Sequence, residues 1–322
     1  MQHQANDPGS MALAPPLSPA DLCAERPLLP NEPRVRDWPR EQELTERHLL
    51  PALAQLEAFF LWLRADLDRT LCPAAPVKRG KPYPLGQCLE ISLAAKARLS
   101  AFDASALRGA PAQGWAALAA FLAAGGTLRQ VWGDLRGEYF QNAFLAGTLY
   151  IDISNDTVVA SKPKVEIRPF AEARFGPVRD HLHYVAIARR YWSAWIFPNH
   201  ILPDLAHCFP AITAIPGVGL QLESTSYYMI ALSLSDGFRG SEAVLQAPPL
   251  SADLFGFLRH SLAGHGVALP SSPAAGRALA LQTCETHRRN RWQEDRTAIG
   301  AALQSALATN RRLSQVEARL AA

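Results

Sequence analysis

The sequence predicts an α+β fold in which helices pack on a small antiparallel sheet. Apolar residues recur every three or four positions over residues 49–67, 88–99 and 111–124, as in amphipathic helices. The period changes to two near residues 127–132 and 148–154, as in strands with one buried face. Helical periodicity then returns after residue 178. Helices and strands are therefore grouped along the chain, which favours α+β over an alternating βαβ arrangement.

The first half of the chain is predicted to contain three helices. The first has a single apolar stripe over residues 49–67, with Pro51 in its first turn, where a missing N–H costs nothing. A loop over residues 72–84 leads to the second helix, residues 88–99. The third, residues 111–124, is rich in alanine and ends at Gly125-Gly126, which is a typical stop signal for a helix.

Strands are expected next. In residues 148–154 the alternation places Leu149, Ile151 and Ile153 on one face. A turn at Asn155-Asp156 predicts a hairpin partner within residues 157–167, whereas residues 139–145 are compatible with either helix or strand. Further on, residues 178–195, 251–262 and 297–320 are predicted helices, and the β-forming residues of 220–234 predict one or two strands.

These elements suggest three parts. Eight of the 25 prolines fall within residues 1–40, so this stretch is expected to be an extended arm, disordered or lying on the surface. Residues 41–170 are expected to form a helix plus antiparallel-sheet domain that carries Cys88. Residues 171–322 are expected to form a mainly helical part with a short β segment, packed on the first.

Composition limits the classes of function. The chain has 322 residues, 48% of them hydrophobic and 19% charged, which is ordinary for a globular protein with a substantial core. A net charge of +3 is too small to predict a nucleic-acid or anionic-membrane partner. No apolar run of about 18 residues predicts a membrane span, and no secretory signal is evident. We expect a cytoplasmic protein; its oligomeric state is left open.

The five cysteines are scattered and none forms a C-x-x-C pair, which argues against a disulfide framework and a cysteine-rich zinc site. We expect a reducing compartment, and we assign no cofactor and no metal. One of these cysteines, Cys88, follows a Pro/Gly turn and begins a predicted helix. Unpaired N–H groups and the positive dipole end at a helix N-terminus stabilise a thiolate, so Cys88 is the candidate nucleophile. The alternative is a small apolar residue in a seam between helix and sheet.

The segment Gly86-Gln87-Cys88 resembles the nucleophile turn of transglutaminase-like proteins and, more loosely, of papain-like proteases and arylamine N-acetyltransferases. In those families the cysteine begins a helix packed on an antiparallel sheet. A histidine on one strand is the base, and an Asp or Asn on the next strand orients it. The resemblance implies acyl transfer, or amide or thioester hydrolysis, by the Cys88 thiolate. The substrate would be a small molecule, a peptide or an acyl carrier.

The resemblance also implies site residues. The histidine segment corresponds to Gln130-Val131-Trp132 and the orienting residue to Asp152. Glutamine cannot accept a proton at a useful pH, so the base must come from elsewhere, and His183 is the nominee. Asp152 either orients that base or faces water. Backbone N–H groups with Gln87 or Gln130 would hold the oxyanion, and Trp132 would contact the substrate.

Two other classes of function stay open. With Gln130 in place of the histidine, the same fold would be a catalytically inactive binding or scaffold module. A mononuclear iron oxygenase is the other, built on His183 with a second histidine and a carboxylate. Its further ligands would come from His181, Asp180, His200, His207 or Glu223. On a helix, His181 and His183 point in different directions, which weakens this alternative.

Overall fold

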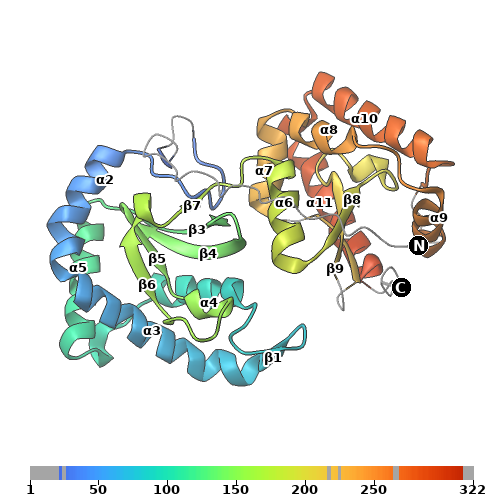
Figure 1. Ribbon diagram of the computed structural model, residues 1–322. Coiled ribbons are helices and arrows are strands. Elements are labelled where there is room, and N and C mark those ends of the chain that lie inside the picture. Colours follow the sequence, from blue (N-terminus) through green and yellow to red (C-terminus); the bar gives the residue numbers. More distant parts are fainter. Residues whose placement is uncertain (1–21, 24–26, 216–218, 224–225, 264–267, 315–322) are drawn as a thin grey trace, which may run out of the picture.

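A computed structural model describes residues 22–23, 27–215, 219–223, 226–263 and 268–314. The chain forms two lobes that lie side by side, joined between strand β7 and helix α6 (Figure 1). Both lobes combine helices with a small sheet, and every pairing between named strands is antiparallel. The predicted α+β class is therefore confirmed.

The first lobe is built on a five-stranded sheet of order β6-β5-β4-β3-β7. Residues 139–145, which were compatible with helix or strand, belong to a strand that pairs along its whole length with β3. The predicted hairpin after residue 154 is only partly correct. A 3-10 turn at Asn155–Thr157 starts a longer connection, and only β6 at its end pairs with the preceding strand. The strands are β3 (Leu128–Leu135), β4 (Tyr139–Ala146), β5 (Leu149–Asp152), β6 (Glu166–Pro169) and β7 (Phe175–Gly176).

Helices cover one face of this sheet, where Phe144, Leu149, Ile151 and Ile153 are buried beneath them. The predicted apolar stripe of the first long helix is confirmed, although Pro51 lies in a 3-10 turn just before that helix. A short hairpin, β1 (Val77–Lys78) with β2 (Lys81–Pro82), lies between α3 and α4. The helices are α2 (Trp38–Leu44), α3 (Leu53–Ala74), α4 (Cys88–Ser100) and α5 (Gly109–Ala123).

The other face of the sheet is covered by the N-terminal stretch. Leu22 and Val35 pack there with Val131, Leu145 and Tyr150. The described part of the proline-rich stretch therefore contributes to a core, while residues 1–21 and 24–26 of the predicted arm lie outside the described residues.

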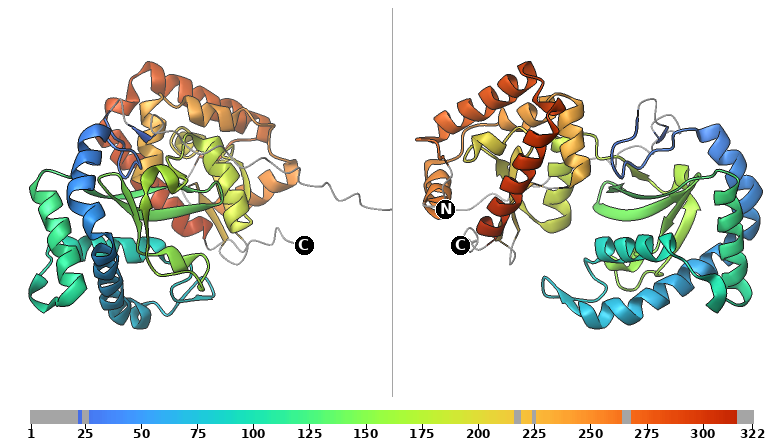
Figure 2. Two further views of the ribbon diagram at one scale, coloured as in Figure 1. Left: turned by 60° about the vertical axis from the view of Figure 1, so that its left-hand side comes forward. Right: turned by 180° about the vertical axis from the view of Figure 1, so that it is seen from behind.

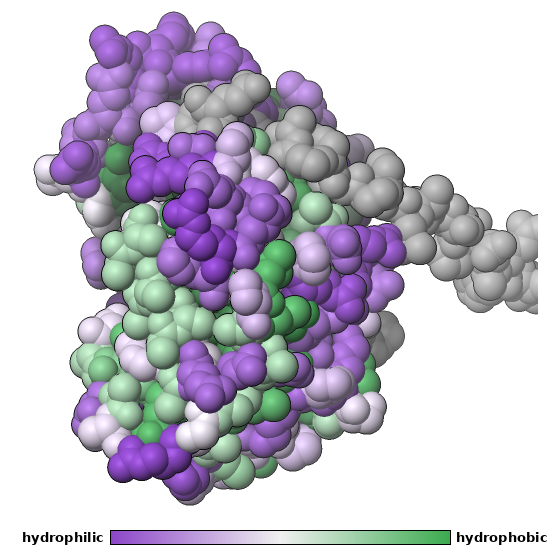
Figure 3. All heavy atoms as spheres, turned by 90° about the vertical axis from the view of Figure 1, so that its left-hand side faces the viewer, coloured by the Kyte–Doolittle hydropathy of each residue, from purple (hydrophilic) through white to green (hydrophobic). Residues whose placement is uncertain are grey.

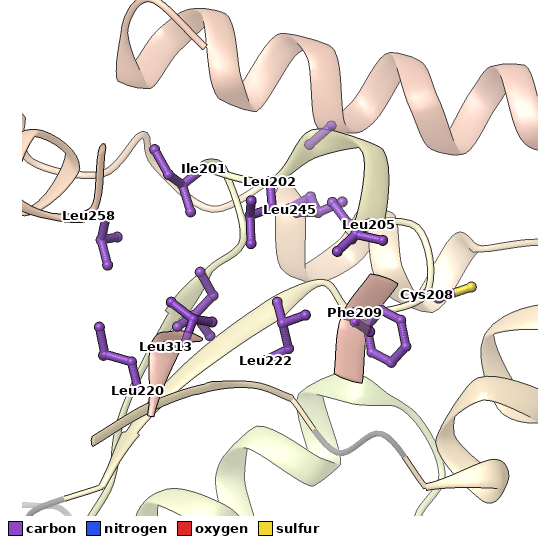
Figure 4. Close-up of a cluster of buried hydrophobic side chains, with 14 of the residues drawn as sticks. Ile201, Leu202, Leu205, Cys208, Phe209, Leu220, Leu222, Leu245, Leu258 and Leu313 are labelled. Atoms are coloured by element: carbon purple, nitrogen blue, oxygen red, sulfur yellow. The ribbon is translucent and has the colours of Figure 1, made fainter. Parts of the chain in front are cut away.

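The second lobe is mainly helical around a three-stranded sheet of order β10-β9-β8. A cluster of buried side chains from the sheet and the surrounding helices, including Phe209, Leu222 and Leu313, forms its core (Figure 4). Helix α11 packs against β10, and the view from behind in Figure 2 shows it running across the surface of this lobe. The elements are α6 (His181–Trp192), β8 (Trp195–Pro198), β9 (Ala211–Ile215), β10 (Gly219–Leu222), α7 (Tyr227–Ser235), α8 (Arg239–Leu245), α9 (Ala252–Leu262), α10 (Pro273–Arg289) and α11 (Arg296–Leu313).

The prediction of strands over residues 220–234 is wrong in its second part. Residues 219–222 form β10, but Tyr227–Ser235 is helix α7. The Ser226 hydroxyl accepts a hydrogen bond from the backbone N–H of Met229, which caps the helix, and Tyr228 and Met229 are buried against α6 and the sheet. Capping and burial together override the β preference of the side chains.

Two helices of the first lobe approach closely at Gly114 of α5. A Cβ atom there would lie 2.0 Å from the carbonyl oxygen of Gln55 on α3. The solvent side of α5 carries alanines such as Ala116 and Ala120, and the surface of this lobe in Figure 3 includes pale hydrophobic areas of this kind. Gly114 is therefore required because α3 and α5 approach too closely there for a Cβ atom to fit.

We expect Gly114→Ala to lower the free energy of unfolding by about 1–3 kcal/mol, because the two backbones must separate. Gly300→Ala is the matched control, since Gly300 lies within α11 and a Cβ there meets no atom within 4 Å. The control should be neutral or stabilising by about 0.5–1 kcal/mol. Urea denaturation of both variants measures the difference, and equal effects would contradict the close approach.

Candidate functional site

The site is centred on Cys88, the first residue of α4. The preceding turn places it there: Gly86 has φ +74°, a conformation that favours glycine, and its N–H donates to the Thr157 carbonyl at 2.8 Å. Lys78 of the β1–β2 hairpin fixes the hairpin to the helix, because its Nζ donates to the Gly86 carbonyl at 2.9 Å and to Glu90 Oε1 at 2.7 Å. The predicted turn that begins a helix with Cys88 is confirmed.

Cys88 lines a cavity of about 420 Å³ between the two lobes. The hairpin and α4 form one wall, strands β3 and β4 form the floor, and the end of α6 with β9 closes the other side. The lining residues are Lys78, Arg79, Lys81, Gly86, Cys88 and Leu89 from the first wall, Trp132, Phe140 and Asn142 from the strands, and Tyr191, Trp192, Ser193 and Ile215 from the second lobe.

The thiol has an amide as its neighbour, not a base. Asn142 Nδ2 lies 3.6 Å from Cys88 Sγ, and the Asn142 backbone also hydrogen-bonds to the thiol. Burial raises the pKa of the thiol, and the negative charge of Asp152 raises it further. The hydrogen bonds from Asn142 and the charge of Lys78 lower it, but the net effect is a raised pKa. The thiol is therefore protonated at neutral pH, although it stands at a helix N-terminus.

Asp152 is fully buried, so the alternative that it faces water is wrong. It lies on the sheet face opposite Ile151 and Ile153, and so opposite the face that α4 covers. Its Oδ2 accepts hydrogen bonds from Gln141 Nε2 at 2.7 Å and from the Tyr150 hydroxyl at 3.1 Å. Burial raises its pKa to about 6, against the effect of these hydrogen bonds. Asp152 thus belongs to a buried polar cluster, and no described histidine is among its hydrogen-bond partners.

His183 lies on α6 and does not line the cavity. Its Nδ1 accepts the backbone N–H of Arg179 at 3.1 Å, so the proton is on Nε2, which donates to Asp134 Oδ2 at 3.1 Å. Asp134 is on β3, so this contact joins the two lobes. The structure therefore does not bring Cys88, His183 and Asp152 together.

Of the residues expected to hold an oxyanion or substrate, only Trp132 lines the cavity. The Gln87 side chain points away and donates to the Ala75 carbonyl at 2.8 Å. Gln130 is buried, and its Nε2 has no hydrogen-bond partner among the described residues. The Trp132 ring stacks on Phe140 with a centroid separation of 5.2 Å.

Sequence reasoning missed Asn142, which occupies the position beside the thiol that was assigned to Gln130. Asn142 pairs with Trp132 in the β3–β4 register, whereas Gln130 pairs with Phe144, two residues further along the strand. Asp152 on the next strand binds Gln141 and not Asn142, so the three side chains do not form a connected set. The only sequence signal was that residues 139–145 could be a strand.

The iron ligands considered above do not converge. No group of three or more His, Cys, Asp or Glu side chains within the described ranges is placed to hold a metal ion. His200 Nε2 is 2.9 Å from the Leu245 carbonyl oxygen, and His207 packs against Phe238 and Trp292.

A buried Ser–His–Glu arrangement lies in the second lobe. His181 Nδ1 is 2.7 Å from Glu223 Oε1, and its Nε2 is 2.7 Å from Ser233 Oγ. The Ser233 hydroxyl donates to the Met229 carbonyl at 3.1 Å, so Nε2 must donate to Oγ and cannot accept the hydroxyl proton. All three side chains are buried, which makes this a structural ion pair with a hydroxyl acceptor and not an activated serine.

Comparisons of the chain with protein-family models, with curated proteins and with solved structures give no match. The resemblance of Gly86-Gln87-Cys88 to transglutaminase-like proteins therefore stays a prediction. In the part of the chain that the structure describes, no helix has the length and apolar character needed to cross a bilayer.

Proposed function

We propose that the protein is a binding module that holds a small molecule in the cavity between its lobes, with Cys88 as part of one wall and not as a nucleophile. The observation that carries this proposal is the Asn142 amide beside the thiol, in the place where acyl transfer needs a base. A cavity of about 420 Å³ is within the ordinary size range of small-molecule sites.

The electrostatics of the thiol support the same proposal. A nearby histidine, a cation or a helix N-terminus lowers the pKa of an activated cysteine. Cys88 has the helix N-terminus, yet burial dominates and raises its pKa. Lys78, a cation that acts on the thiol, is already paired with Glu90.

The second candidate is acyl transfer or amide or thioester hydrolysis through Cys88. It is favoured by the position of Cys88 at the first turn of α4, because the first N–H groups of a helix have no acceptor within the helix and can stabilise an oxyanion. This function needs a proton acceptor supplied by the bound substrate, because no described histidine contacts the thiol.

Alkylation of the folded protein by iodoacetamide, read for each cysteine by peptide mass mapping, separates the two candidates. We expect Cys88 to react slowly at pH 7–8, with its half-maximal rate above pH 9, because its pKa is raised from 9.0. Exposed Cys72 is the internal reference, and buried Cys208 and Cys284 should react only after unfolding. Faster alkylation of Cys88 than of Cys72 below pH 8 would instead establish an activated nucleophile.

A further inference from the structure

We propose that the cavity at Cys88 takes an organic anion with a flat apolar body and one phosphate or carboxylate group. This inference rests on the proposed binding function and names the class of ligand. It follows from the separate placement of cations, aromatic rings and uncharged polar groups around the cavity.

Among the described residues that line the cavity, the charged ones are all cations. They are Lys78, Arg79 and Lys81, and no described Asp or Glu is among the lining residues. Lys78 is engaged with Glu90 and the Gly86 carbonyl, so its charge is largely compensated. Arg79 and Lys81 form no ion pair with any described residue. Two uncompensated cations at a cavity favour an anionic ligand group over a neutral or cationic one.

The β1–β2 hairpin fixes these cations at the cavity. Arg79 and Gly80 have φ of 52° and 73°, two consecutive left-handed residues that reverse the chain between the paired Lys78 and Lys81. Since Lys78 ties the hairpin to α4, the turn carrying Arg79 is held beside the cavity. Arg79 and Tyr191 of the second lobe line the same cavity. Burial raises the pKa of Tyr191, and the Arg79 cation opposes that rise.

Aromatic side chains of both lobes line the rest of the cavity. Trp132 and Phe140 come from the first lobe, and Tyr191 and Trp192 from the second, stacked at 5.8 Å with an interplanar angle of 30°. Aromatic surfaces of this kind favour a ligand with a flat ring, because the ring can stack on them. Asn142 and Cys88 add uncharged polar groups to the lining.

The test uses the full chain and follows tryptophan fluorescence with 1-naphthyl phosphate, 1-naphthoate, 1-naphthol and inorganic phosphate. We expect both naphthyl anions to bind at least about ten-fold more tightly than naphthol or phosphate, from two charge-assisted contacts. Whichever of the two anions binds more tightly shows whether the cavity recognises a phosphate or a carboxylate group. Bound ligand should also slow alkylation of Cys88 at pH 9, which places it in this cavity.

The variant Arg79→Ala/Lys81→Ala should lose the preference for the anions while still binding naphthol. Lys96→Ala/Arg259→Ala is the matched control, because it removes the same charge from two exposed residues that do not line the cavity. Equal affinity of the wild type for naphthol and the anions, or loss of the preference in the control variant alone, would overturn the proposed ligand class. The proposal that the protein is a binding module would still stand. Failure of every probe to bind overturns the inference, and rapid alkylation of Cys88 at neutral pH would separately overturn the proposed function.

Discussion

Replacing Asp156 by alanine is expected to lower the free energy of unfolding by about 3–5 kcal/mol, because it leaves a buried guanidinium without its main partner. Arg64 of α3 has no exposed side-chain area. Its two terminal nitrogens donate to Asp156 Oδ1 at 2.8 Å and Oδ2 at 3.0 Å. Burial opposes the charge of Arg64, yet the carboxylates of Asp156 and Asp68 raise its pKa above the ordinary value.

The contact joins α3 to the segment after β5. Arg64 also donates to the Ile153 carbonyl at 2.7 Å, so one side chain positions the end of the strand and the turn that follows. Asp66→Ala is the control: Asp66 is on the same helix and pairs with Arg69 and Arg98 near the surface, where an ion pair contributes about 1 kcal/mol or less. Similar losses in both variants, measured by urea denaturation, would mean that the buried pair is not a stabilising contact.

Helices and strands with one buried face were predictable, because burial leaves a direct periodic record in the sequence. Leu56, Phe60 and Leu63 are fully buried on the predicted stripe of α3. Likewise Leu149 and Ile151 share the buried face expected of β5. Helix α10 was not predicted although Ser272 and Pro273 give it a cap and a first-turn proline, because few large apolar residues mark its buried side.

The candidate site was predictable only in its local part. The position of Cys88 at a helix start depends on the turn just before it, which the sequence contains. Its neighbour Asn142 depends on the β3–β4 register and on how α4 packs on the sheet, and both are long-range features. The burial of Asp152 has the same origin: alternation gave the correct face, but not that the N-terminal stretch covers it.

The second large effect is expected at the buried pair of His181 and Glu223. Burial lowers the pKa of His181, but the charges of Glu223, Asp236 and Asp180 outweigh it, so the pKa is raised above 6.5. A raised histidine pKa stabilises the folded state fully below the unfolded value of about 6.5, and this contribution is lost as the pH rises through the folded pKa. The free energy of unfolding should therefore fall as the pH rises from about 6.5 through the folded pKa of His181.

Glu223→Gln is expected to lower the free energy of unfolding by about 3 kcal/mol at pH 6, since the imidazolium loses its carboxylate. The deficit should shrink as the pH rises above the folded pKa of His181, where the wild-type histidine is neutral as well. Urea denaturation at a series of pH values between 5 and 9 measures both proteins.

Ser233→Ala is the matched control for this pair. It removes only the hydroxyl that accepts from Nε2, so it should cost about 1 kcal/mol and keep the pH dependence of the wild type. If Ser233→Ala alters the pH profile as Glu223→Gln does, the hydroxyl and the carboxylate act as one unit, and the serine would have to be reconsidered as a nucleophile. If instead only Glu223→Gln removes the pH dependence, the charge of His181 stabilises the packing of α6 against the end of β10 and against α7.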